Sequence, residues 1–274
     1  MRRANLNLTV SYAILGLAAL AILLPLYSIL VVAISPQSAP AIGLGLPADP
    51  QWSNFAAAWA QGNFGVLIKN STVIAVSVVA VAVVFSVLSG FAFSMMEFPG
   101  KRLLFLPLLV GLVLPFEAVI LPLYYNLRAL GLTDSPLGVI LPEVGLYVAF
   151  GTLWMRAVFA GVSREIVEAA RIDGANAMQL LWIVLIPMCR PAITTLVVLF
   201  FLWSWNEFLV SLVILQDPLQ RTAPAGLGAF VGEYLTNVPL LAAGAIYVAL
   251  PVVIVYFFLQ RYIIEGLTQG AVKG

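Results

Sequence analysis

The sequence predicts an all-α protein that crosses a lipid bilayer several times, as a polytopic bundle of transmembrane helices. Its composition leads to this prediction, because 62% of its 274 residues are hydrophobic and only 9% are charged. Soluble domains carry about 25% charged residues, so a soluble chain of this length would not hide so much apolar surface from water. The apolar runs are also about twice as long as the strands of a membrane barrel, which favours helices.

Six segments are long and apolar enough to cross the hydrocarbon core, which takes about 20 residues in a helix. The first follows Arg2 and Arg3 and is longer than the apolar core of a typical signal peptide, so we expect an uncleaved first span. Prolines within several segments are expected to kink them. The expected spans, in a single transmembrane domain of residues 1–274, are about 12–34, 69–93, 103–125, 138–158, 191–215 and 240–262.

The distribution of Lys and Arg predicts the orientation, since cytoplasmic loops carry the excess of positive charge. With the N-terminus inside, ten of the 13 basic residues fall on the cytoplasmic side and three on the outer side. We therefore expect both termini in the cytoplasm. The outer set is Lys69, Arg128 and Arg221, and the inner set is Arg2, Arg3, Lys101, Arg102, Arg156, Arg164, Arg171, Arg190, Arg261 and Lys273.

Several classes of function are disfavoured by what the sequence lacks. The net charge of +1 disfavours nucleic acid as a partner. The chain has no histidine, which excludes His-based catalysis and His metal sites, and its one cysteine, Cys189, has no partner for an internal disulfide. We therefore expect no enzyme activity, no catalytic residue and no metal site in this chain.

The longest inside connection, residues 159–190, is predicted to be ordered rather than a flexible linker. Ser163 is a good N-cap for a short helix, and Gly174 supplies the left-handed position that ends it. A second helical stretch is expected at about 176–186, where Pro187 stops it. The result is a compact projection on the cytoplasmic face that is suited to contact a cytoplasmic partner.

The same loop contains Glu168-Ala169-Ala170, Gly174 and Val184-Leu185-Ile186-Pro187. These residues and their spacing resemble the EAA loop of permeases in importers of the ABC class, whose pattern is E-A-A-x3-G-x9-I-x-L-P. Val replaces Ile and Ile replaces Leu, which are volume-conserving changes. In that family the short helix docks in a groove on a separate ATPase subunit. The resemblance implies an ATPase contact through Glu168, Ala169, Ala170, Asp173, Gly174, Ile186 and Pro187.

Shorter segments extend the resemblance to the carbohydrate-uptake group, most closely to the smaller, six-span partner of maltose-like pairs. They are Phe98–Arg102, Trp205–Phe208 and Gln260–Gly274. The resemblance implies a sugar as the substrate and a location in the inner (cytoplasmic) membrane. It also implies a complex with a second, similar permease, two copies of the ATPase and an extracytoplasmic sugar-binding protein.

This chain is not expected to bind ATP itself. It contains no G-x-x-x-x-G-K-[ST] phosphate loop, because Gly100-Lys101 lacks the preceding glycine and the following hydroxyl residue. ATP and magnesium are therefore assigned to the partner ATPase. Its closure is expected to move the docked helices and, through them, the kinked spans.

A few polar residues fall inside the expected spans, where ionisable groups are costly and usually face a cavity or a partner. Sugars are bound by planar polar side chains and aromatic faces, so span five is the best candidate for a wall of the translocation path. Asn206 and Glu207 would point about 100° apart on one helix, so we expect one to line the path and the other to bond a neighbouring helix. A purely interhelical role is the alternative. The candidates are Trp203, Trp205, Asn206, Glu207 and Glu117.

Two other classes of transporter stay open. An ABC permease for another solute, such as a polyol, a glycerophosphodiester or a peptide, would share these features. A proton- or sodium-coupled carrier is favoured by the intramembrane glutamates, but it is disfavoured by the EAA-like loop and by the lack of an internal repeat. The ligand of the binding protein distinguishes a sugar permease from an ABC permease for another solute. The energy source of uptake distinguishes an ABC importer from an ion-coupled carrier.

Overall fold

The structure is a computed structural model that describes residues 2–38, 44–232 and 236–271. The described chain is all-α and divides into two compact units. Unit 1 is formed by the residues up to Gly65 together with Gly226–Leu250. Unit 2 is formed by Val66–Ala225 together with the residues from Pro251 onward.

Four of the expected spans each correspond to one continuous helix, because long apolar runs satisfy their backbone within a helix. Judged by length and composition, four helices can cross a membrane. The number reaches six if each of two bent helix pairs is one span, namely Lys101–Val113 with Phe116–Ala129 and Ala177–Met188 with Arg190–Asn206. The four continuous helices are α1 (Arg2–Ala33), α3 (Phe64–Met95), α6 (Pro136–Ala160) and α13 (Val238–Ala271).

The segment expected as one span at 103–125 is two helices, α4 (Lys101–Val113) and α5 (Phe116–Ala129), bent by 107°. This break corrects the expectation of one kinked helix. Its cause is local, because proline disfavours the helical region for the residue that precedes it. Leu114 and Pro115 are both extended, with ψ of 126° and 120°.

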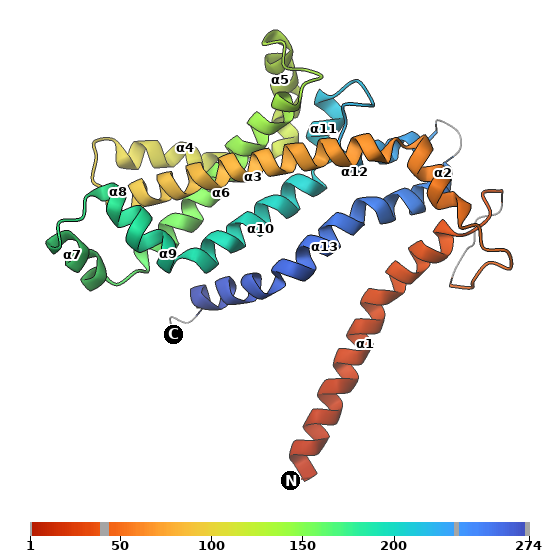
Figure 1. Cartoon of the computed structure of the whole chain (residues 1–274), viewed down its shortest axis with the longest axis horizontal. Coiled ribbons are helices and arrows are strands. Elements are labelled where there is room, and N and C mark those ends of the chain that lie inside the picture. Colours follow the sequence, from red (N-terminus) through yellow and green to blue (C-terminus); the bar gives the residue numbers. More distant parts are fainter. Residues whose placement is uncertain (1, 39–43, 233–235, 272–274) are drawn as a thin grey trace. The chain divides into compact units, whose positions relative to one another are not determined.

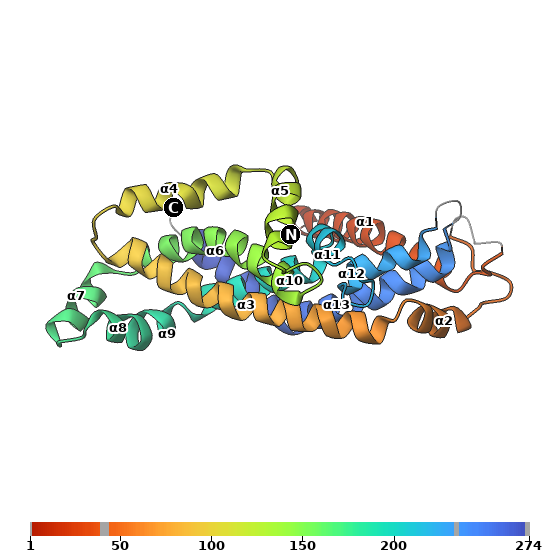
Figure 2. The same cartoon turned by 90° about the horizontal axis from the view of Figure 1, so that it is seen from above.

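The fifth expected span is also interrupted. α10 (Arg190–Asn206) ends at Glu207, whose backbone is extended with ψ of 124°, and α11 (Leu209–Ile214) follows. The expectation that Asn206 and Glu207 share one helix is therefore wrong. α11 packs against α5, so the second helices of the two broken segments lie side by side (Figures 1 and 2).

Small residues allow α3 and α6 to pack closely in unit 2. A Cβ atom at Gly90 would collide with α6, and one at Gly151 would collide with the side chain of Ser86. The hydroxyl groups of Ser89 and Thr152 join the same two helices at 2.6 Å. The small-residue pair Ser86-x-x-x-Gly90 is thus a packing interface, as such pairs are between many membrane helices.

Replacing Gly151 with alanine should lower the melting temperature of the purified protein. The added Cβ meets Ser86 and lies 2.9 Å from the ring of Phe200, so the helices must move apart. Overpacking of this kind costs about 1–3 kcal/mol. Gly145→Ala is the matched control, because nothing lies within 4 Å of a Cβ at Gly145 in the same helix. Equal melting temperatures for the two variants would contradict this packing.

Unit 1 contains α1, the short helix α2 (Ser53–Gln61) and the first part of α13. α2 was not predicted from the sequence, and a buried amide holds it at the end of α1. The Asn54 side chain donates hydrogen bonds to the carbonyls of Ala33 and Ser35, at 2.9 and 2.8 Å. Beyond this junction α1 is mostly exposed, because only 6% of its most apolar stretch is buried. Lipid or protein must therefore cover it.

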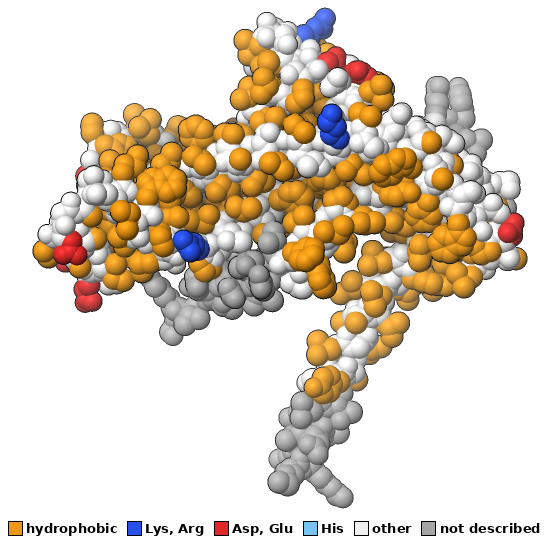
Figure 3. Space-filling model, in the orientation of Figure 1, with side chains coloured by type: hydrophobic (Ala, Val, Ile, Leu, Met, Phe, Trp, Pro, Cys, Tyr) orange, Lys and Arg blue, Asp and Glu red, His pale blue; other side chains and the backbone are white. Residues whose placement is uncertain are grey.

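The surface of unit 2 has the polarity expected of a membrane bundle. On the face shown in Figure 3, hydrophobic side chains cover α3, whereas charged side chains lie near α5 and near α7 (Arg164–Ile172). An apolar band with charges toward its ends matches the hydrocarbon core and its two interfaces. Two further short elements are α12 (Ala223–Gly226) and a 3-10 turn (Leu227–Phe230).

Candidate functional site

The loop at 159–190, which is expected on the cytoplasmic side, forms a helix, a tight turn and a second helix. α7 begins after Ser163, whose hydroxyl accepts a hydrogen bond from the Glu165 N–H at 3.3 Å. It ends at the turn containing Gly174, where φ is +85°. The predicted residues at both ends of α7 are confirmed.

Two backbone hydrogen bonds close the end of α7 in a Schellman motif. The Gly174 N–H donates to the Arg171 carbonyl, and the Ala175 N–H donates to the Ala170 carbonyl, both at 3.0 Å. Glycine adopts the left-handed conformation that this motif needs without steric cost. Gly174 therefore sets the direction in which the chain leaves α7.

The second helix of the loop is longer than predicted, because Pro187 does not end it. It starts at Asn176, which forms a capping box with Gln179. The Ile186 N–H donates to the Leu181 carbonyl, five residues back, so Pro187 enters where the usual ladder is already interrupted. The helix consists of α8 (Ala177–Gln179), a π-helical stretch (Leu180–Leu185) and α9 (Ile186–Met188).

The loop lies at the end of unit 2 where α3 ends (Figures 1 and 2). Ile172, which is 85% exposed at the end of α7, was not among the predicted contact residues. The available signal was its helical position, opposite the buried Val167. Of the predicted ATPase-contact residues, the half-buried ones are Ala170, Ile186 and Pro187, and the exposed ones are Glu168, Ala169, Asp173 and Gly174.

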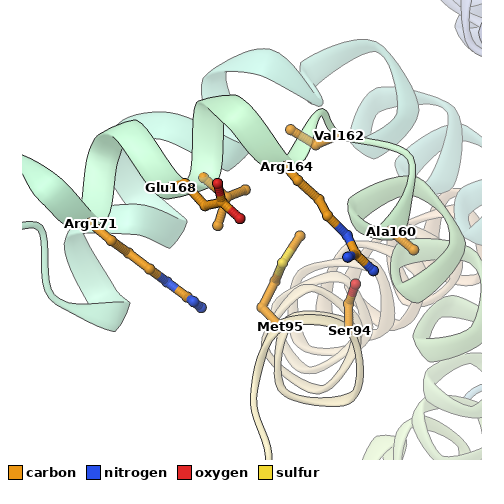
Figure 4. Close-up of a pocket in the computed structure, with 8 residues that line it drawn as sticks. Ser94, Met95, Ala160, Val162, Arg164, Glu168 and Arg171 are labelled. Carbon is orange, nitrogen blue, oxygen red and sulfur yellow. The ribbon is translucent and has the colours of Figure 1, made fainter.

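A pocket of about 360 Å³ lies between α7 and the end of α3. Figure 4 shows Arg164 directed toward Ser94 of α3, with Glu168 and Arg171 farther along α7. Among the described residues, the one ion pair joins Lys101 to Glu97. Arg164, Glu168 and Arg171 therefore form no ion pair within the described part of the chain. Their charges are available to a partner that approaches this end of unit 2.

Glu207, at the break in the fifth segment, caps α11. Its two carboxylate oxygens accept hydrogen bonds from the Val210 N–H at 3.0 and 2.9 Å, and one also accepts from the Ser211 N–H at 3.3 Å. A helix start leaves such N–H groups without partners and favours negative charge. Glu207 is therefore bound to its own backbone rather than to a neighbouring helix.

Trp203 and Asn206 share an exposed face of α10, since residues three apart on a helix are neighbours. Trp203 is 38% exposed and packs edge-on against Phe150, with ring centroids 4.9 Å apart. Asn206 is exposed. Trp205, by contrast, is 2% exposed and stacks on Phe201 at 5.6 Å. The structure brings Trp203 and Asn206 together and turns Trp205 into the protein.

The sequence predicts Glu117 in the middle of a span, but the structure does not place it in the middle of a helix. It is exposed in the first turn of α5, just after the break at Pro115. A carboxylate is favoured at this positive helix end. Among the described residues, no three acidic or cysteine side chains gather as metal ligands do.

Burial reveals a polar pair that sequence analysis did not place together. Glu143 of α6 is 1% exposed, and its carboxyl group lies beside the hydroxyl of Ser204 of α10, which is 2% exposed. Neither side chain forms a hydrogen bond of standard geometry within the described residues. The pair places buried polar atoms at the contact between α6 and α10, the helix that carries Trp203.

Asp134 is a second residue that the sequence analysis missed. Its φ is +57°, and one carboxylate oxygen accepts hydrogen bonds from the N–H groups of Gln216 and Asp217. This side chain ties the α5–α6 connection to the chain that follows α11. An aspartate that caps a neighbouring turn is ordinary turn chemistry, but its distant partner leaves no signal in the sequence.

The chain matches the family model of the binding-protein-dependent transport system inner membrane component over residues 82–269. That stretch contains α7, Gly174 and the broken fifth segment. The chain is a member of this family of ABC importer permeases. The permease is accordingly an inner-membrane transport component and not an enzyme, and the EAA-type loop is typical of its family.

Relatives cover nearly the whole permease. It is 32% identical to the arabinooligosaccharides transport system permease protein AraQ of Bacillus subtilis, over 92% of this chain and 91% of that protein. It is 30% identical to the trehalose transport system permease protein SugB of Mycobacterium tuberculosis, over 100% of this chain and 99% of that protein.

A crystal structure shows the same fold. It is that of a bacterial ABC transporter involved in the import of the acidic polysaccharide alginate, and the match has a TM-score of 0.78 at 26% identity. The match covers 96% of this chain and 98% of that chain. Because the family works with a binding protein and an ATPase, this permease acts with both kinds of partner.

Proposed function

We propose that this permease forms half of the translocation path of a sugar importer and couples that path to a separate ATPase. The observation that carries the coupling role is the exposed helix α7, closed by the Schellman turn at Gly174. The names of both relatives above, which refer to saccharides, support a sugar as the substrate.

Trp203 and Asn206 form the part of the path wall that this chain contributes at the fifth segment. Both side chains are exposed on one face of α10, close to the break at Glu207. Interrupted helices commonly build substrate sites in membrane transporters. An aromatic face beside a planar amide offers the stacking and hydrogen bonding that a sugar ring requires.

The coupling runs from the ATPase through α7 to α10. ATP and magnesium are bound by two copies of the ATPase, which act on this permease and on a second, similar one. The ATPase contacts α7, whose exposed Ile172 is the apolar side chain that a protein groove would cover. The second helix of the loop meets α10 at Cys189, so movement of α7 reaches the span directly.

The chain crosses the membrane six times, with both termini in the cytoplasm. The four continuous helices each cross once, and the broken segments 101–129 and 190–214 supply the other two crossings. The supporting observation is the excess of basic residues on one side, ten against three.

Cysteine labelling tests this orientation. In a Cys189→Ser background, Leu46→Cys should react with a membrane-impermeant maleimide in intact cells. Glu97→Cys should react only after permeabilisation. Both native side chains are exposed, 67% and 92% respectively, so lack of reaction would reflect the membrane and not burial. Labelling of residue 97 in intact cells would overturn the proposed topology.

The substrate class is tested through the binding protein that serves this permease. The purified binding protein should bind a mono- or oligosaccharide in a calorimetric panel that also contains polyols, glycerophosphodiesters and peptides. Tight binding of a member of another class, with no sugar bound, would contradict the sugar assignment but leave the ABC coupling intact.

A further inference from the structure

The second helix of the cytoplasmic loop, Ala177–Met188, carries an exposed apolar stripe. Trp182 and Ile183 lie in its π-helical stretch, and both side chains are exposed. The stripe consists of Met178, Trp182, Ile183 and Met188, which are 59%, 57%, 68% and 46% exposed.

The opposite face of this helix is fixed in the core of unit 2. Leu180, Leu181 and Leu185 are each at most 2% exposed and belong to the main hydrophobic cluster. The helix therefore cannot roll to bury the stripe without exposing these leucines. Exposing buried leucine side chains to water is unfavourable, so the stripe stays outward and needs a cover from outside the chain.

The direction and length of the helix point to the membrane interface. It is bent by 79° from α10, which in the proposed topology crosses the bilayer. A helix nearly perpendicular to a span runs close to the membrane plane. At 1.5 Å per residue it is about 18 Å long, which is shorter than the hydrocarbon core of about 30 Å.

The second helix of the loop differs from α7 in its charged residues. No charged residue occurs from Ala177 to Met188, whereas α7 carries two arginines and two glutamates within nine residues. A surface that docks on a soluble protein resembles α7, and a surface that enters a bilayer resembles the stripe. Two residues support a position at the bilayer surface. Trp182 belongs to a residue type that is enriched at membrane interfaces, and the exposed Arg190, just after the helix, can reach lipid phosphates.

We propose that the apolar stripe inserts into the cytoplasmic leaflet at the level of the headgroups and the first acyl carbons. The inserted helix then anchors the loop at the membrane surface, and α7 stays outside the membrane. This inference goes beyond the proposed transport function and uses two parts of it, the crossing of the bilayer by α10 and the cytoplasmic position of the loop.

Spin labelling of the reconstituted transporter tests the proposal. The complex with its partner subunits carries Cys189→Ser and Ile183→Cys, and is reconstituted in vesicles of phosphatidylethanolamine and phosphatidylglycerol. The label at 183 should collide frequently with oxygen and rarely with a water-soluble nickel chelate. Its ratio of oxygen to nickel collisions should exceed by several-fold that of a label at Glu97→Cys, the exposed aqueous control. Met178→Cys, on the same stripe, should behave like Ile183→Cys and serves if one variant folds poorly.

Three other environments of the stripe would give different results, and each result would overturn the proposal. If the ATPase covers it, removing the ATPase makes residue 183 accessible to the nickel chelate. If the second permease covers it, both reagents are excluded whether or not the ATPase is present. If the stripe faces water, the nickel chelate reaches it throughout. Uptake by the labelled complex is measured in parallel, so a failure of the transport function is recognised separately.

Discussion

Replacing Gly174 with valine is expected to reduce solute uptake by about tenfold or more. The φ of +85° at this position costs an L-residue about 1–2 kcal/mol, and a β-branched side chain is among the least suited. A loss of that size lowers the population of the native turn about 5–30-fold. Uptake into cells and the amount of ATPase that co-purifies with the permease should both fall.

Two variants separate the turn from general destabilisation. Nothing lies within 4 Å of a Cβ at Gly174, so the effect comes from the backbone and not from a collision. Gly174→Asn should keep most of the uptake, because asparagine tolerates the left-handed conformation. Gly131→Val imposes similar strain, at φ +68° and in equally open space, but in the turn after α5, and should spare coupling. Normal uptake by Gly174→Val would remove the coupling role of the turn.

Asn206→Ala and Trp203→Leu are expected to impair uptake while the complex still assembles. Each removes one exposed group from the proposed path wall, a hydrogen-bonding amide or an aromatic face. The loss of about 1 kcal/mol per contact corresponds to about a fivefold rise in KM for uptake, with a change in preference among sugars. ATP hydrolysis stimulated by the binding protein should stay normal, because neither residue lies in the cytoplasmic loop.

The matched control for these variants is Trp205→Ala. Trp205 is buried, so its truncation leaves a cavity and costs about 3–5 kcal/mol. It should lower complex yield and melting temperature without changing sugar preference in what remains. If Asn206→Ala and Trp203→Leu also lose yield and stability but keep their selectivity, these residues serve packing and the path assignment fails.

The elements that sequence analysis predicted correctly rest on local chemistry. Ser163 and Gly174 mark the two ends of α7 because N-caps and left-handed C-caps depend on a few neighbouring residues. The four continuous helices follow from apolar runs, which satisfy the backbone wherever lipid is the solvent. The loop that contains α7 was therefore recognisable from its own residues before any tertiary contact was considered.

The errors concern places where tertiary structure or two competing local rules decide the outcome. Pro115 and Pro187 are both prolines in apolar segments, yet the first separates two helices and the second lies within one, after a π turn. Glu207 was expected on a continuous helix, but its carboxylate stabilises a new helix start. The difference between the buried Trp205 and the exposed Trp203 depends on the packing of α10, which spacing alone does not show.

Uptake by the reconstituted transporter tests the central account most directly. Vesicles contain the permease with its partner permease and ATPase, enclose ATP, and receive binding protein and labelled sugar from outside. Uptake should require both enclosed ATP and binding protein, and it should continue when ionophores collapse the proton and sodium gradients. Uptake that persists without ATP and stops when an ion gradient is collapsed would contradict the account and identify an ion-coupled carrier.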